Sequence, residues 1–136
     1  MPVNRTTLDT NVLLRLLIRD IPEQFARAQR LLTTAGGRFL VPDYVFVELA
    51  FALERHYSFT RQQIGETFTK IMNIDVIDCH RARLANATTY WQDHPKLSFE
   101  DCLIAEYAQS HDATPLWTFD RKLANQHPSA QEVPNL

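Results

Sequence analysis

The sequence predicts an α/β protein: a three-layer α/β/α sandwich with a mostly parallel central sheet. Short apolar runs that suit strands alternate with longer segments of helical periodicity. Strands that are separated by helices favour parallel pairing, and the helices then cover both faces of the sheet. At 136 residues and 45% hydrophobic content, the chain is long enough to bury a core, and we expect a single domain over residues 1–136.

The N-terminal half begins with a strand. The pattern predicts, in order, a strand over residues 3–8, a helix over 11–19, a helix over 22–35, a strand over 39–41 and a helix over 44–56. Pro22 suits the first turn of a helix. Gly36 and Gly37 are expected to end that helix, and Asp43 is expected to cap the next one.

The C-terminal half continues the alternation. It predicts a helix from about residue 60 to 73, a strand over 74–77, helices over 82–93 and 98–110, a strand over 114–118, a short helix over 121–125 and a last strand near 132–133. Thr60 with Gln63, and Ser98 with Asp101, fit the capping-box pattern at helix starts.

Composition excludes some classes of protein. The net charge of −2 gives no general sign of nucleic-acid binding. The apolar run over residues 12–18 is interrupted by Arg15 and is too short to span a bilayer, and no signal peptide is visible. Cys79 and Cys102 have no metal-binding spacing, so we expect reduced thiols and a cytoplasmic protein without membrane contact.

Four acidic residues stand out because their surroundings are apolar: Asp9, Glu48, Asp101 and Asp120. Asp9 and Asp120 each follow a predicted strand, at the sheet edge where ligands of parallel sheets bind. Each acid also has a structural alternative. Asp9, Asp101 and Asp120 suit helix caps, and Glu48 suits an exposed strip that includes Arg55.

If these four acids converge, they need a cation. Two carboxylates about 4 Å apart repel by about 4 kcal/mol at an effective dielectric constant near 20. Ligation by carboxylates alone favours hard ions, Mg²⁺ or Mn²⁺, over Zn²⁺. Metal sites of this kind commonly act on phosphates. An aspartyl phosphatase is disfavoured, because the position of its second aspartate is Asn11 here.

The motifs that carry these acids resemble those of a known family. In chain order they read LDTNVLLRLL, VPDYVFVELAFAL, SFEDCLIAEYA and LWTFDRKL. This set resembles the four acidic motifs of PIN-domain ribonucleases, and within these the chain is most similar to the VapC-like toxins of toxin–antitoxin pairs. The first strand, VNRTTL, is more polar than the central strand usual in that family.

The resemblance implies a PIN-like nuclease domain and a metal-dependent endoribonuclease, in which a metal-activated water hydrolyses RNA. By motif, the catalytic residues and ligands of Mg²⁺ (or Mn²⁺) are Asp9, Glu48, Asp101 and Asp120, with polar support from Asn11 and Thr118. The implied partners are an RNA substrate and a cognate antitoxin protein, and we also expect a homodimer. The alternatives are a non-toxin PIN nuclease of RNA processing and a non-catalytic PIN domain that binds RNA or protein.

Basic residues near the acids are candidates for RNA contact. Arg15 and Arg19 share one face of the first predicted helix, and Arg121 and Lys122 directly follow Asp120. Their alternative is ordinary solvated positions. We expect the five histidines to lie at the surface or at helix ends, and both tryptophans to pack rather than stack on bases.

Overall fold

The computed structural model describes residues 4–34 and 36–135. Its elements, in chain order, are β1 (Arg5–Thr7), α1 (Thr10–Ile18), α2 (Pro22–Thr34), β2 (Arg38–Leu40), α3 (Asp43–Tyr57), α4 (Arg61–Met72), β3 (Ile77–Asp78), α5 (Arg81–Asp93), α6 (Phe99–Ser110), β4 (Leu116–Thr118), α7 (Arg121–Gln126) and β5 (Ala130–Glu132). The predicted alternation is therefore present throughout, and the α/β class is confirmed. The predicted positions 3 and 35 lie outside the described residues.

All strand pairs are parallel, but the strands form two sheets. One sheet has the order β1-β2-β3, with Thr6 opposite Phe39 and Phe39 opposite Ile77. The other contains β4 and β5, with Trp117 opposite Gln131. The parallel pairing agrees with the prediction, and the division into two sheets differs from the single central sheet that the sequence predicts.

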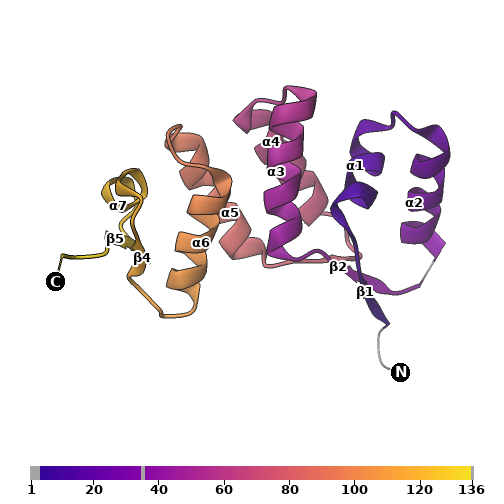
Figure 1. The fold of residues 1–136 in the computed structure, drawn as a ribbon. Coiled ribbons are helices and arrows are strands. Elements are labelled where there is room, and N and C mark those ends of the chain that lie inside the picture. Colours follow the sequence, from indigo (N-terminus) through magenta and orange to yellow (C-terminus); the bar gives the residue numbers. More distant parts are fainter. Residues whose placement is uncertain (1–3, 35, 136) are drawn as a thin grey trace.

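The helices stand side by side, with β1 and β2 at the foot of α1 and α3 and with β4 and β5 beside α6 (Figure 1). From one end of the molecule to the other they run from α1 and α2, through α3 and α4, to α5 and α6, and then to α7 with β4 and β5. The two sheets therefore lie apart, with α5 and α6 between the β1–α1 end and the C-terminal strands. None of the described helices has the length and apolar character that a membrane span needs.

Local capping is formed at the start of α4 but not, in the predicted way, at the start of α3. At α4, the Thr60 hydroxyl accepts from the Gln63 amide at 3.1 Å and the Gln63 side chain accepts from the Thr60 amide at 2.8 Å, which confirms the predicted capping box. At α3, the prediction that Asp43 is the N-cap is wrong. Pro42 is the cap residue and Asp43 is the first helical residue, and the carboxylate of Asp43 pairs with Arg83 instead of capping the helix.

Most other boundaries lie close to their predicted positions. Helix α1 ends at Ile18, one residue early, because Arg19 adopts a left-handed backbone with φ of 59°. Gly36 after α2 has φ of 74°, a conformation that glycine adopts without strain. Strand β3 is Ile77–Asp78 rather than residues 74–77, because the preceding residues form a turn.

An aromatic cluster forms the centre of the core. The rings of Phe46 and Phe68 pack edge to face, with their centres 5.1 Å apart. The centre of the Phe99 ring lies 5.3 Å from that of Phe68 and 5.4 Å from that of Trp91. Such ring pairs add to the stabilisation from burial. Trp91 packs as predicted, but Trp117 on β4 is 54% exposed, so the packing prediction for that tryptophan is wrong.

Arg83 joins three helices. Its Nε donates to Oδ2 of Asp43 at 2.7 Å, and its Nη1 donates to the Ser110 hydroxyl at 3.2 Å. The guanidinium also lies 5.2 Å from the centre of the Tyr107 ring. Only 10% of the Arg83 side chain is exposed, so the ion pair is shielded from solvent. Arg83 thus fixes α5 and α6 against the N-terminal end of α3.

The C-terminal unit, which we define as β4, α7 and β5, is attached to α5 and α6. The Tyr90 hydroxyl on α5 donates to the backbone carbonyl of Gln126. The Ser129 hydroxyl donates to the Gln109 side chain on α6 at 3.3 Å. These contacts hold β4 on the α5–α6 side of the molecule (Figure 1).

His127 is the C-cap residue of α7, so it lies at a helix end, one of the two positions that the sequence predicts, but its side chain is buried. The residue is 2% exposed, and its Nδ1 accepts from the Ser129 amide at 3.0 Å. Its Nε2 faces Oε1 of Glu106 at 3.4 Å, which is too long for a strong hydrogen bond. Burial lowers the pKa of His127 below its usual value, and the nearby Glu106 only partly offsets this effect.

The cysteines are free thiols. Cys102 is buried on α6, and burial raises its pKa to about 12, so this thiol is protonated at neutral pH. Burial also raises the pKa of Cys79, which is half-buried after β3. Both side chains are therefore poor nucleophiles.

The lowered pKa of His127 predicts an acid-sensitive fold. The unfolded chain takes up this proton near its ordinary pKa of about 6.5, whereas the folded chain does so only at lower pH. The free energy of unfolding should therefore fall as the pH drops below about 6.5, until the folded-state pKa is passed. Melting temperatures measured between pH 7.5 and 5 should fall less steeply for His127→Gln than for the wild type. The exposed His56→Gln variant is the control and should keep the wild-type slope; equal slopes for all three proteins would contradict this origin.

Candidate active site

Asp9 lies at the turn between β1 and α1. It is the N-cap of α1, has an extended backbone, and its Oδ1 accepts from the Thr10 amide at 2.7 Å. One carboxylate oxygen of Asp9 therefore serves as a helix cap, which was the structural alternative to metal binding. Among the contacts of the described residues, Oδ2 has no hydrogen bond, and the residue is exposed. Asp9 can therefore cap the helix and present its second oxygen to a ligand.

Thr10 connects this turn to Glu48. The Thr10 side chain is buried, with 6% exposure, and its hydroxyl donates to Oε1 of Glu48 at 2.8 Å. Glu48 is half-buried on α3, with Leu49 buried beside it, so it does not belong to a fully solvated strip. Two of the predicted site residues, Asp9 and Glu48, are thereby brought to one place; we call them the N-terminal acids.

Thr10 belongs to the site although the sequence analysis does not predict it. The cap is Asp9, and the Thr10 hydroxyl instead orients an acid that lies 38 residues away in the chain. A hydroxyl between the Asp and Asn of the first motif was the available signal, but its partner is fixed only by the packing of α1 against α3.

Asp101 lies in the first turn of α6. Its Oδ2 accepts from the Ser98 amide at 3.3 Å, and the Ser98 hydroxyl accepts from the Asp101 amide at 3.1 Å. The capping box is therefore formed, as the sequence predicts. Asp101 is half-buried, and its carboxylate has a structural use whatever else it binds.

Asp120 caps α7 in a similar way. Its Oδ1 accepts from the amides of Lys122 at 2.9 Å and Leu123 at 3.3 Å. The Thr118 hydroxyl accepts from the Asp120 amide at 3.0 Å, so Thr118 orders the turn that carries the acid. We call Asp101 and Asp120 the C-terminal acids.

The structure does not bring all four acids together. Within residues 4–34 and 36–135, no three or more His, Cys, Asp or Glu side chains are close enough to hold a metal ion. The N-terminal acids lie on β1–α1 and α3, whereas the C-terminal acids lie on α6 and at the end of β4 (Figure 1). Carboxylates are the correct donors for Mg²⁺ or Mn²⁺, but in this conformation their arrangement does not fit a shared ion.

The expected arginine stripe on α1 is not formed. Arg15 pairs with Asp20, with Nη1 2.7 Å from Oδ1, and only 16% of its side chain is exposed. Arg19 lies beyond the end of the helix and stacks on Phe25 at 4.5 Å. Asn11 is exposed and lines, with Arg15, a cavity of about 440 Å³ between α1 and α2.

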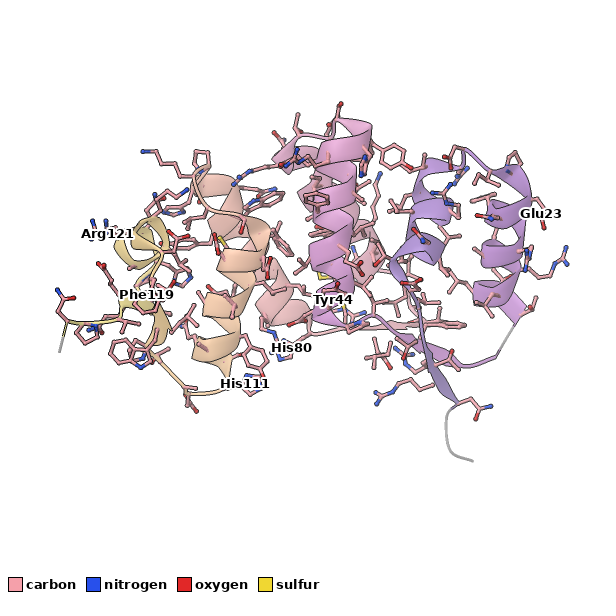
Figure 2. All side chains as sticks on the ribbon, viewed as in Figure 1. Glu23, Tyr44, His80, His111, Phe119 and Arg121 are labelled. Atoms are coloured by element: carbon pink, nitrogen blue, oxygen red, sulfur yellow. The ribbon has the colours of Figure 1, made fainter. Side chains whose placement is uncertain are left out.

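The second basic pair lies on α7. Arg121 is largely exposed and pairs with Glu132 at 3.2 Å, which leaves part of its guanidinium to solvent. Lys122 is exposed, and in the described part of the chain it forms no ion pair. Figure 2 shows Arg121 on the C-terminal unit, near Phe119. Of the four candidate RNA contacts, these two are the most accessible to a phosphate beside Asp120.

Comparison with known proteins identifies the family of this chain. The model of the PIN domain family matches residues 6–126, from β1 to the end of α7, and so includes all four acids. A search of curated proteins gave no match. PIN domains are generally nucleases, and they generally depend on a metal ion. Because the match covers well over half of the sequence, this chain belongs to the PIN domain family.

Proposed function

We propose that this protein is a Mg²⁺- or Mn²⁺-dependent endoribonuclease that acts as the toxin of a toxin–antitoxin pair. The observation that supports the nuclease proposal is that Thr10, at the carboxyl end of a parallel strand, is hydrogen-bonded to both acids: its amide donates to Asp9 and its hydroxyl donates to Glu48. Ligands of parallel α/β sheets bind at that end. The presence of all four motif acids favours a catalytic protein over a PIN domain that only binds RNA or protein.

The helix-cap hydrogen bonds orient the carboxylates of Asp9 and Asp120 for metal binding. Backbone amides at a helix N-terminus stabilise an ionised side chain and fix its rotamer. Asp9 and Asp120 each accept such amide hydrogen bonds through Oδ1. Their remaining oxygens are thus held in fixed directions. Asp9, Glu48, Asp101 and Asp120 would supply the metal ligands in a conformation that unites them, and Asn11 and Thr118 would give polar support.

The RNA would follow the basic residues beside Asp120. Lys122 and Arg121 are exposed next to the acid, so a phosphate group can reach both. Arg15 and Arg19 are less available for binding phosphate. The guanidinium of Arg15 pairs with Asp20, and that of Arg19 stacks on Phe25. Contacts with phosphates would make binding weaken as the salt concentration rises.

The toxin proposal depends on the resemblance of the motifs to VapC-like proteins. A cognate antitoxin would then cover the acids, with a basic side chain placed against Asp9 or Glu48 and apolar anchors beside it. Phe51 on α3 is 58% exposed and is available as one docking point, whereas Phe46 is fully buried in the core. The alternative of a non-toxin nuclease in RNA processing uses the same acids.

The nuclease proposal predicts loss of cleavage in Asp9→Asn. The asparagine oxygen still accepts from the Thr10 amide, so the cap and the fold should persist while the charge is removed. We expect RNA cleavage to fall by at least about 100-fold, since one interaction of several kcal/mol is lost. The control is Asp93→Asn, the same change at an exposed acid at the end of α5. Wild-type cleavage by a folded, nuclease-free preparation of Asp9→Asn would overturn the proposal.

Thr10 is expected to act as a positioning residue through Glu48. Thr10→Val keeps the buried shape but removes the donor, which should cost about 1 kcal/mol of stability and lower kcat with little change in KM. Thr10→Ser keeps the hydroxyl and should retain most of the activity. If the two variants lose kcat equally, Thr10 contributes only packing and the positioning role is wrong.

The toxin proposal predicts growth arrest when this chain is expressed alone. Asp101→Asn should relieve the arrest, because the charge is lost while the amide oxygen can still complete the capping box with Ser98. Co-expression of a cognate antitoxin should also restore growth and should co-purify with the protein. Normal growth in cells that contain active nuclease at high concentration would contradict the toxin role and leave the nuclease role standing.

A further inference from the structure

In the part of the chain that the structure describes, four strand edges lack a neighbour: those of β1 and β3 in one sheet and those of β4 and β5 in the other. The edges of β1 and β4 are the two that precede predicted site residues, Asp9 and Asp120. Among the described residues, β1 pairs only with β2, and β4 pairs only with β5. An open edge presents unpaired backbone groups, which proteins usually cover or pair. The three residues of β1 are all exposed, although parallel sheets are normally buried on both faces.

The surfaces beside these edges are also uncovered. A cavity of about 540 Å³ lies over one face of the β1-β2-β3 sheet and is lined in part by Arg5, Leu40 and Asp78. Tyr44, which also lines it, is 68% exposed. On the other sheet, Trp117 is 54% exposed and Phe119 is 81% exposed. Figure 2 shows Phe119 on the C-terminal unit and Tyr44 at the base of α3, well apart. These apolar groups have no cover in a single chain.

Strands β1 and β4 end in the same way. Thr7 ends β1, Leu8 follows, and Asp9 begins the turn into α1. Thr118 ends β4, Phe119 follows, and Asp120 begins the turn into α7. If the strands paired in parallel with their ends aligned, the strands would lie about 4.8 Å apart, and the two turns that carry Asp9 and Asp120 would be neighbours. That arrangement suits a shared divalent ion.

The chain holds its own β4 away from its own β1. Arg83 ties α5 and α6 to α3, and Tyr90 ties the C-terminal unit to α5. Movement of β4 to β1 within one chain would break at least one of these attachments. It would break the Arg83–Asp43 pair if α5 and α6 moved with the C-terminal unit, and the Tyr90–Gln126 contact if the unit moved alone. A second copy can supply β4 without breaking any of them.

We infer that two copies exchange edges, so that β1 of each protomer pairs in parallel with β4 of the other. A two-fold axis relates the two pairings, and each sheet then has the order β3-β2-β1-β4-β5, with the last two strands from the partner. Each acid site contains Asp9 and Glu48 of one protomer and Asp120 of the partner subunit. The catalytic role of this shared site rests on the proposed nuclease function, whereas the pairing of the strands does not.

Cross-linking tests the geometry without using activity. With the strand ends aligned, Thr6 lies opposite the partner's Trp117. We would mix two differently sized tagged chains in a Cys79→Ser background, one with Thr6→Cys and one with Trp117→Cys, and add a short bifunctional maleimide. A cross-linked heterodimer is expected. Replacing Trp117→Cys with Glu23→Cys, an exposed position on α2, should abolish it.

Two results would overturn this geometry. One is a monomer in light scattering at the concentrations at which the protein is active. The other is a cross-link within a single chain that carries both Thr6→Cys and Trp117→Cys, which would show that β4 closes on its own β1.

Mixing inactive variants tests whether the site is shared. Asp9→Asn and Asp120→Asn are each expected to be inactive alone, but their heterodimer contains one site with both wild-type acids and one with neither. After equal mixing and subunit exchange, activity should return to about a quarter of the wild-type value per chain, because half of the dimers are mixed and half of their sites are intact.

No recovery, with an active wild type and proven exchange of subunits, would overturn the shared site. A wild type that cleaves no RNA would instead overturn the proposed nuclease function, and the cross-link would still decide the pairing of the strands.

Discussion

The arrangement of the whole molecule depends on Arg83. Its guanidinium is nearly buried, pairs with Asp43 at 2.7 Å and reaches Ser110 at 3.2 Å, so it fixes three helices at once. A charge that is shielded from water must keep its partner, and removing either partner is costly. The position of α5 and α6 is therefore set relative to α3. Since the C-terminal unit is attached to these two helices, Arg83 also sets the distance between β4 and β1.

Helix capping and ligand binding are compatible uses of the same carboxylates. Asp9 and Asp120 cap helices through one oxygen, and Asp101 completes a capping box. Capping alone explains why an acid is found at a helix start, but asparagine or serine caps equally well. Capping does not explain why the buried Thr10 hydroxyl donates a hydrogen bond to Glu48, because Glu48 caps no helix. That hydrogen bond satisfies a buried hydroxyl and also orients the Glu48 carboxylate beside the turn that carries Asp9.

Local features were predictable from the sequence, and long-range ones were not. The Thr60–Gln63 and Ser98–Asp101 capping boxes, the break at Gly36 and the parallel pairing all follow from short-range chemistry. The prediction that Asp43 caps α3 was wrong, because the partner of its carboxylate, Arg83, lies 40 residues away in the chain. The four acids were found by their apolar surroundings, but their division into two groups depends on how α5 and α6 pack. The burial of His127 and the exposure of Trp117 depend on the same packing, which no local pattern encodes.

The unusual polarity of the first strand then has a physical explanation. Residues Arg5–Thr7 carry no large apolar side chain, whereas the neighbouring β2 contains the buried Phe39. A strand buried on both faces within one chain would need apolar residues. A strand with polar and charged side chains at an open edge is protected from non-specific pairing with other chains. The sequence of β1 thus fits a strand that is exposed in the single chain and covered only after a specific second strand has been added.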